Sequence, residues 1–219
     1  MVRPAWVVLD LGETLVDETR QWALWAQFFG VPSLTFAACL GAMIEARRPH
    51  TDVIELFSHG LDVTTAETRK DAQGLGLSLT ERDLYPDALP TLHRLRADGY
   101  RTAVMANQPS SVEPFLASLP VDAWATSATW GIAKPDPAFF VRVARELSAE
   151  AHDVAYVGDR IDSDVLPAKK AGMTAIHLRR GPWGLIQAQW PEAREADLNL
   201  DALSDLPDAL QMLTPAGTH

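Results

Sequence analysis

Short apolar runs alternate with amphipathic segments along the second half of the chain, and a further apolar run lies near its start. The apolar runs have the length of buried strands and cover residues 5–9, 101–106, 153–158 and 173–178. Between them lie segments with helical spacing that begin at an acid or proline or end at glycine, at residues 87–99, 136–148 and 162–172. This alternation predicts an α/β fold with a parallel sheet flanked by helices, whose ligand site lies beyond the carboxyl ends of the strands.

Residues 16–85 interrupt this alternation. The segments 18–30 and 33–47 have helical spacing, and no convincing strand occurs before residue 101. We therefore expect an all-helical cap at residues 16–85, inserted into a core formed by residues 1–15 and 86–219. The aromatic side chains near the start of the insertion, Trp22 and Trp25 among them, are spaced as a packed helix face rather than as a ligand site.

Composition narrows the classes of partner. The chain has 219 residues, 47% of them hydrophobic, and a formal net charge of -10, which disfavours nucleic acids and anionic membranes as partners. The single cysteine, Cys39, excludes an internal disulfide and fits a reducing compartment. No apolar run has the length of a membrane span, and no secretory signal is visible. We expect a cytoplasmic protein that acts on a small molecule; its oligomeric state stays open.

Polar side chains capable of chemistry follow the predicted strands. Asp10 follows the first strand, Asn107 follows the strand at 101–106, and Asp159 follows the strand at 153–158. Lys134 precedes a proline-led helix start. A carboxylate can attack phosphorus covalently, and such a reaction needs a hard cation such as Mg²⁺ to neutralise charge. A lysine can hold a phosphoryl oxygen, so these residues predict a phosphoryl-transfer site.

In order and spacing these motifs resemble the haloacid dehalogenase superfamily of hydrolases, most of which are phosphatases. The resemblance spans roughly residues 5–178 and is most specific in "KPDPAFF" (134–140) and "GDRIDSDVLPAKKAGM" (158–173). It implies a Rossmann-like core, a helical cap and a required Mg²⁺. It also implies roles for single residues. Asp10 is the expected nucleophile and metal ligand, and Lys134 is expected to hold the phosphoryl group. Asp159, Asp164 and the backbone carbonyl of Gly12 are expected at the metal.

Two positions depart from the family pattern. The acid that protonates the leaving group is replaced by Gly12, and the hydroxyl that binds the phosphoryl group is replaced by Ala106. A general acid contributes roughly 10²–10⁴ in rate, and one preorganised donor roughly 10²–10³. Enzymes accelerate phosphate-monoester hydrolysis by up to about 10²¹, so both losses leave room for a catalyst. Without the acid, we expect activated phosphate esters or anhydrides as substrates.

Other residues are expected to compensate or to bind the substrate. Asn107, or else Gln108, can replace the missing donor, and Thr14 can assist it. Glu13 is a candidate substitute acid, although its place in the turn favours a side chain that points away. Arg20, Gln108 and Arg179 are candidate substrate contacts, although Arg20 could equally lie on a helix surface and Arg179 more readily fits a structural loop.

Three functions fit the sequence. The first is a Mg²⁺-dependent phosphatase that forms an aspartyl-phosphate. The second is a metal-free dehalogenase-type hydrolase, which the retained Asp159 disfavours because that branch replaces its metal-binding acid. The third is a catalytically impaired binding protein, motivated by Gly12 and Ala106.

Overall fold

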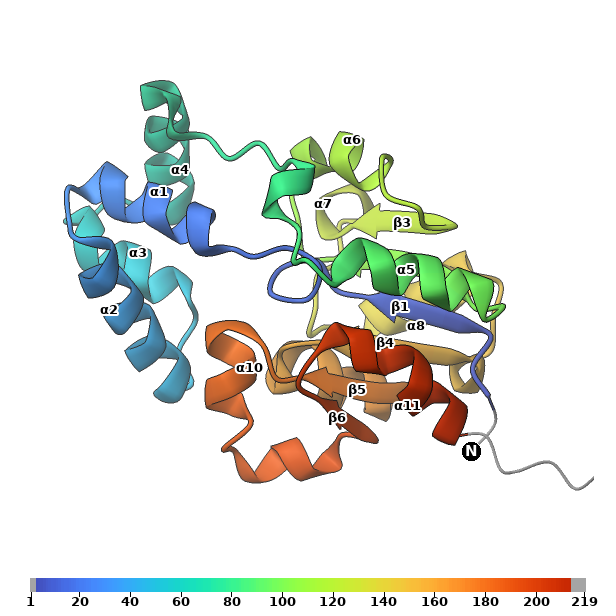
Figure 1. Ribbon diagram of the computed structural model, residues 1–219. Helices are drawn as coiled ribbons and strands as arrows, with labels where there is room; N and C mark the ends of the chain where they lie inside the picture. Colours follow the sequence, from blue (N-terminus) through green and yellow to red (C-terminus); the bar gives the residue numbers. More distant parts are fainter. Residues whose placement is uncertain (1–2, 214–219) are drawn as a thin grey trace, which may run out of the picture.

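The computed structural model describes residues 3–213 and has a twisted parallel sheet at its centre (Figure 1). Within these residues the sheet has six strands in the order β3-β2-β1-β4-β5-β6. The strands are β1 (Trp6–Leu9), β2 (Arg101–Ala106), β3 (Ala123–Thr126), β4 (Val154–Gly158), β5 (Thr174–Leu178) and β6 (Leu198–Leu200). Every pairing is parallel, which confirms the predicted α/β class. The two strands absent from the sequence prediction, β3 and β6, are the short edge strands.

Side chains alternate along each strand, so both faces of the sheet are apolar here. Helices cover both faces. In β1, Val7 and Leu9 join one apolar cluster, and Trp6 and Val8 join the other. The first cluster is covered by α5 (Ala88–Ala97), α6 (Glu113–Leu116) and α11 (Leu206–Met212). The second is covered by α7 (Ser127–Trp130), α8 (Pro137–Glu146) and α9 (Leu166–Lys170). Short helical turns complete the connections: η2 (Glu81–Asp83), η3 (Ser110–Val112), η4 (Ala151–Asp153), η5 (Ile161–Val165), η6 (Pro191–Glu195) and η7 (Leu203–Asp205).

A separate group of helices lies beyond one end of the sheet (Figure 1). It comprises α1 (Thr19–Phe29), α2 (Ser33–Glu45), α3 (Thr51–Ser58), α4 (Val63–Lys70) and the turn η1 (Asp71–Leu75). Trp22 and Trp25 are buried in its apolar cluster, as their spacing predicts. One further helix, α10 (Gly181–Gln187), adds Trp183 to the same cluster from the far end of the sequence.

The chain enters and leaves this helical group through two adjacent segments. The amide of Asp17 donates to the carbonyl of Asp83 at 2.8 Å, and the amide of Tyr85 donates to the carbonyl of Leu15 at 2.9 Å. The helices between these segments are those expected of the cap, while the limits at residues 16 and 85 stay a prediction. Residues 1–2 and 214–219 of the predicted core lie outside the described residues.

No single helix within residues 3–213 has the length and apolar character needed to cross a membrane. The pair α1 and α2 meets that test only when the two are taken together across a bend of 111°.

The strand register determines where the functional site lies. Leu9 of β1 pairs with Val104 of β2 and with Val157 of β4. The three strands therefore end close together, and the residues that follow them converge at the middle of the sheet edge.

The buried face of α8 provides a stability test. Phe139 is fully buried, whereas Val141 on the same helix is 67% exposed. We expect Phe139→Ala to lower the free energy of unfolding by about 3–5 kcal/mol, because the lost ring leaves a cavity. Val141→Ala, the matched control, is expected to change it by less than about 0.5 kcal/mol. Denaturant unfolding followed by circular dichroism measures both, and equal effects would contradict this packing of α8.

Candidate active site

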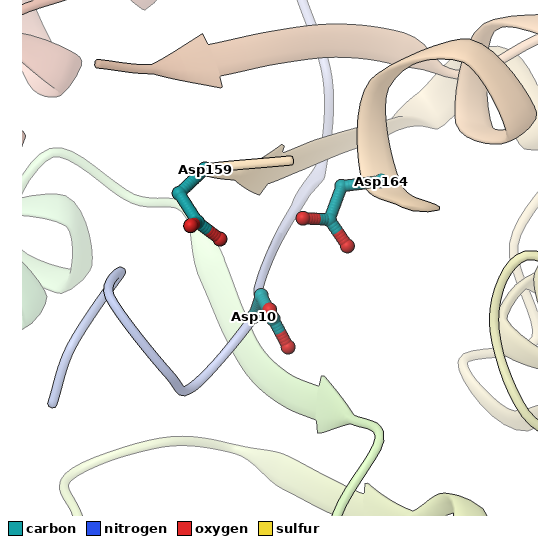
Figure 2. Close-up of side chains that lie close together, drawn as sticks. All are labelled: Asp10, Asp159 and Asp164. Carbon is teal, nitrogen blue, oxygen red and sulfur yellow. The ribbon is translucent and has the colours of Figure 1, made fainter. Parts of the chain in front are cut away.

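Three aspartates from separate segments meet at the carboxyl edge of the sheet (Figure 2). Asp10 follows β1, Asp159 follows β4, and Asp164 lies in η5. One carboxylate oxygen from each lies within 4.8 Å of the others. Asp159 and Asp164 are buried, and Asp10 is 9% exposed. Three carboxylates this close repel one another unless a positive charge lies among them.

Lys134 supplies one positive charge to this cluster. Its Nζ lies 2.8 Å from Oδ1 of Asp10 and 2.5 Å from Oδ1 of Asp164, and its side chain is almost completely buried. Burial acts to lower the pKa of Lys134, but the carboxylates of Asp10 and Asp164 raise it well above its usual value. The lysine therefore stays charged and links the two acids.

The loop that carries Lys134 is held from both sides. Asn107 donates from Nδ2 to the carbonyl of Lys134 and accepts from its amide, both at 2.8 Å. Immediately downstream, Asp136 caps α8 by accepting from the amide of Ala138, and Pro137 occupies the first turn. Asn107 thus positions the lysine, a different task from the phosphoryl contact expected of it. Its role as a phosphoryl donor stays a prediction.

Each carboxylate oxygen of Asp164 has a partner of its own. Its Oδ2 accepts the amide of Arg160 at 3.0 Å, while Oδ1 faces Lys134. Gly158 makes room for it, because a Cβ at that position would lie 2.3 Å from Oδ2 of Asp164. Asp164 therefore closes the loop after β4 and also faces the acidic cluster.

The donor set fits a hard divalent cation. Burial, followed by the charges of Asp164 and Asp10, raises the pKa of Asp159 well above its usual value. Asp159 forms no ion pair within the described residues, and the charge of Arg160 offsets this rise in its pKa only in part. Carboxylate oxygens are the ligands that Mg²⁺ prefers, and a cation among them removes the repulsion. Asp10 and Asp159 are the residues best placed to hold such an ion.

A cavity of about 250 Å³ opens over this cluster. Its floor includes Asp10, Gly12, Lys134 and Asp159, and Asn107 and Gln108 also line it. Side chains that the sequence analysis did not single out for the site complete its walls: Glu18, Gln21, Trp22, His50, Glu67, Arg160, Ser163 and Trp183. Several of these lie in helices far from the motifs in sequence, so only their position in the fold identifies them. The cavity suits a small ligand.

Four of the candidate residues do not line this cavity, and one of them, Asp164, lies beneath it against Lys134. Thr14 is fully buried, and its Oγ1 has no hydrogen-bond partner within the described residues. Arg20 forms a bidentate ion pair with Asp83 and lines a smaller neighbouring cavity of about 10 Å³. Arg179 forms a bidentate ion pair with Asp201. Gln108 alone of the candidate substrate contacts lines the cavity over Asp10.

Glu13 and Glu18 both line the cavity but are held differently. Glu13 accepts the amide of Glu18 at 3.1 Å and the hydroxyl of Tyr85 at 2.5 Å, so each of its oxygens has a partner. Glu18 is half-buried. Loss of solvation and the nearby carboxylates of Glu13 and Asp10 raise the pKa of Glu18 to about 8.

The fold and this cluster together define an α/β protein with a carboxylate-lined site at the carboxyl edge of its sheet. A sequence profile of the haloacid dehalogenase-like hydrolases matches residues 5–172. The chain therefore belongs to this family, as its motifs indicated.

Several relatives of this chain carry phosphatase names. It is 35% identical over 104 residues to a glyceraldehyde 3-phosphate phosphatase of Methanopyrus kandleri, a match that covers 45% of each chain. It is 29% identical to phosphoglycolate phosphatase 1 of Pseudomonas aeruginosa, over 93% of this chain and 78% of that protein. The chain spans only about half the length of the first relatives, from 45% to 57% of each.

A solved structure with the same fold is that of a predicted phosphoglycolate phosphatase from Haemophilus somnus. It matches with a TM-score of 0.64 at 20% identity and covers 95% of this chain and 99% of that one. At this identity the likeness supports the fold alone.

The ion pairs of Lys134 provide a test of the site's electrostatics. We expect Lys134→Met to lower the free energy of unfolding by about 3–5 kcal/mol at neutral pH, because it leaves buried carboxylates without their cation. Adding Asp164→Asn to this variant should restore part of the lost free energy of unfolding, since it removes one of the two carboxylates that contact Lys134.

Lys169→Met is the matched control. Lys169 forms an ion pair with Asp197 at 2.7 Å but is 39% exposed, so its loss should cost about 1 kcal/mol or less. Denaturant unfolding of the four proteins measures the series. Equal destabilisation by Lys134→Met and Lys169→Met would contradict the role given to Lys134.

Proposed function

We propose that this protein is a Mg²⁺-dependent phosphatase that acts on a small phosphorylated substrate through an aspartyl-phosphate on Asp10. The observation that carries the proposal is the contact of Asp10 with Lys134 beside a second carboxylate, Asp159, that lies within 4.8 Å and forms no ion pair within the described residues. A nucleophilic carboxylate needs both positive charges near it, one fixed and one supplied by an ion. A cytoplasmic location is part of the proposal and accords with the single cysteine.

The proposed reaction has two displacements at phosphorus. Asp10 attacks the phosphorus atom, and the bond to the leaving oxygen breaks. Lys134 holds a phosphoryl oxygen while its charge also orients Asp10. Water then attacks the phosphorus of the aspartyl-phosphate and regenerates Asp10 with release of phosphate. Asp10, Asp159 and the Gly12 carbonyl, with Asp164 nearby, would hold the Mg²⁺, which would supply positive charge against the phosphoryl group.

The size of the cavity limits the substrate to a small molecule, and the absence of an acid at position 12 limits the leaving group. The cavity of about 250 Å³ admits a phosphoryl group with a few further atoms. Gly12 has no acidic side chain to protonate the leaving group. The expected substrates are therefore activated esters and anhydrides such as acetyl phosphate, whose leaving groups are stable anions. The names of two relatives, glyceraldehyde 3-phosphate phosphatase and phosphoglycolate phosphatase, instead denote esters of alkyl hydroxyl groups.

Phosphate release tests the proposal. With Mg²⁺ present, we expect turnover of acetyl phosphate and p-nitrophenyl phosphate, abolished by EDTA and restored by added Mg²⁺. Asp10→Asn should lower kcat on the order of 10³-fold or more, because it removes the nucleophile. Absence of turnover by the unmodified protein would favour the binding-protein alternative. Halide release from 2-haloacids that persists in EDTA would favour the dehalogenase alternative.

Metal binding can be tested without turnover. A ligand at 100 times its dissociation constant adds about 2.7 kcal/mol to the free energy of unfolding. We therefore expect saturating Mg²⁺ to raise the thermal unfolding midpoint, and Asp159→Asn to weaken this effect. The exposed Asp201→Asn is the control and should respond to Mg²⁺ like the unmodified protein. A midpoint that Mg²⁺ leaves unchanged in every protein would argue against the site.

A further inference from the structure

The space beside Gly12 is filled by the carboxyl group of Glu18. A Cβ built on Gly12 would lie 2.3 Å from Oε1 of Glu18 and 2.8 Å from its Cδ. Glycine is not required there by the backbone, because Gly12 is not among the residues with left-handed φ. The absent side chain at position 12 and the carboxyl group of Glu18 therefore occupy the same place, and only one of them fits.

Glu18 has no evident structural task. It precedes α1 as the N-cap residue, yet its side chain makes no capping hydrogen bond. No basic side chain within residues 3–213 forms an ion pair with it. Glu18 lines the cavity that contains Asp10, Lys134 and Asp159. A half-buried carboxyl group that forms no ion pair within the described residues and lies at a reactive cavity is suited to contact the substrate.

Glu13, the substitute acid suggested by the sequence, already has a hydrogen-bond partner for each carboxylate oxygen. Tyr85 and the amide of Glu18 bond to its two oxygens. Its carboxyl group also packs against Gly181, where a Cβ would lie 2.3 Å from Oε2 of Glu13. Glu13 therefore holds the turn after β1, and Glu18 is the acid that remains beside position 12.

We propose that Glu18 is the catalytic acid and base of this protein, in place of a side chain at position 12. The proposal rests on the phosphatase function proposed above. It widens the substrate class from activated phosphates to monoesters of alkyl alcohols, whose leaving oxygen needs a proton.

The proton balance closes over the two displacements. As Asp10 attacks phosphorus, the electron pair of the breaking P–O bond goes to the leaving oxygen, which takes the proton of the Glu18 carboxylic acid. The alcohol departs, leaving aspartyl-phosphate and the Glu18 carboxylate. Water then attacks phosphorus and gives a proton to Glu18. This step releases phosphate and restores the Asp10 carboxylate and the Glu18 acid.

Leaving-group dependence tests this role. The unmodified protein, Glu18→Gln and Gly12→Ala are assayed for kcat/KM with ethyl phosphate and acetyl phosphate in the presence of Mg²⁺. Glu18→Gln keeps the shape of the side chain without the acid. Gly12→Ala keeps the backbone carbonyl but places a methyl group where the Glu18 carboxyl group lies. Glu55→Gln, an exposed glutamate of α3, is the matched control.

The expected result is selective. Each of the two variants should lower kcat/KM for ethyl phosphate roughly 10²–10⁴-fold more than for acetyl phosphate, since only the alkoxide needs the proton. The control should keep the ratio of the unmodified protein. Melting curves check that the variants remain folded, and a Gly12→Asp, Glu18→Ala double variant should recover ethyl phosphate hydrolysis by returning the acid to position 12.

Other outcomes separate this inference from the proposed function. Turnover of acetyl phosphate but not ethyl phosphate by the unmodified protein would overturn the role of Glu18 and leave the phosphatase standing. An equal loss of both substrates in Glu18→Gln, or no loss, would also overturn it. Turnover of neither substrate by the unmodified protein would overturn the phosphatase function, and this role with it.

Discussion

The repulsion among the carboxylates at the sheet edge is the constraint on which the site depends. Parallel strands bring Asp10 and Asp159 together because β1 and β4 end in register, and the loop after β4 adds Asp164. Lys134 neutralises part of this charge through two short contacts. Much of the surrounding structure holds that lysine in place. Asn107 clamps its main chain, and the capped start of α8 fixes the loop that follows it.

Position 12 lacks the acid of the family pattern, and the proposed acid, Glu18, reaches the same place from the start of α1. Gly12 leaves space in the turn after β1, and the chain itself refills that space from Glu18, at the start of α1. A carboxyl group is therefore still present, but it is carried by Glu18, next to the helical insertion, rather than by residue 12 in the turn after β1. Because Glu18 adjoins α1, the position of that helix relative to the sheet sets the position of the proposed acid.

Much of the fold could be predicted from the chain itself. The buried strands β1, β2, β4 and β5 are short uniform apolar runs, and α5 and α8 have clear apolar faces with terminal signals. The edge strands β3 and β6 have a weaker signal in the sequence, because neither contains a long apolar run. In β3 the apolar run covers only residues 123–125, and Trp124 within it is 38% exposed. Long-range pairing, rather than local pattern, makes these segments strands.

The sequence alone determined the family and the acids and lysine of the site, because motif order and strand-end placement are local properties of the chain. Only the tertiary structure decided which charges are available. Arg20 and Arg179 are committed to Asp83 and Asp201, partners 63 and 22 residues away. Glu18, which has no motif around it, becomes a site residue because folding places its carboxyl group against Gly12. Ion pairs and side-chain packing depend on distances across the fold, which residue spacing does not contain.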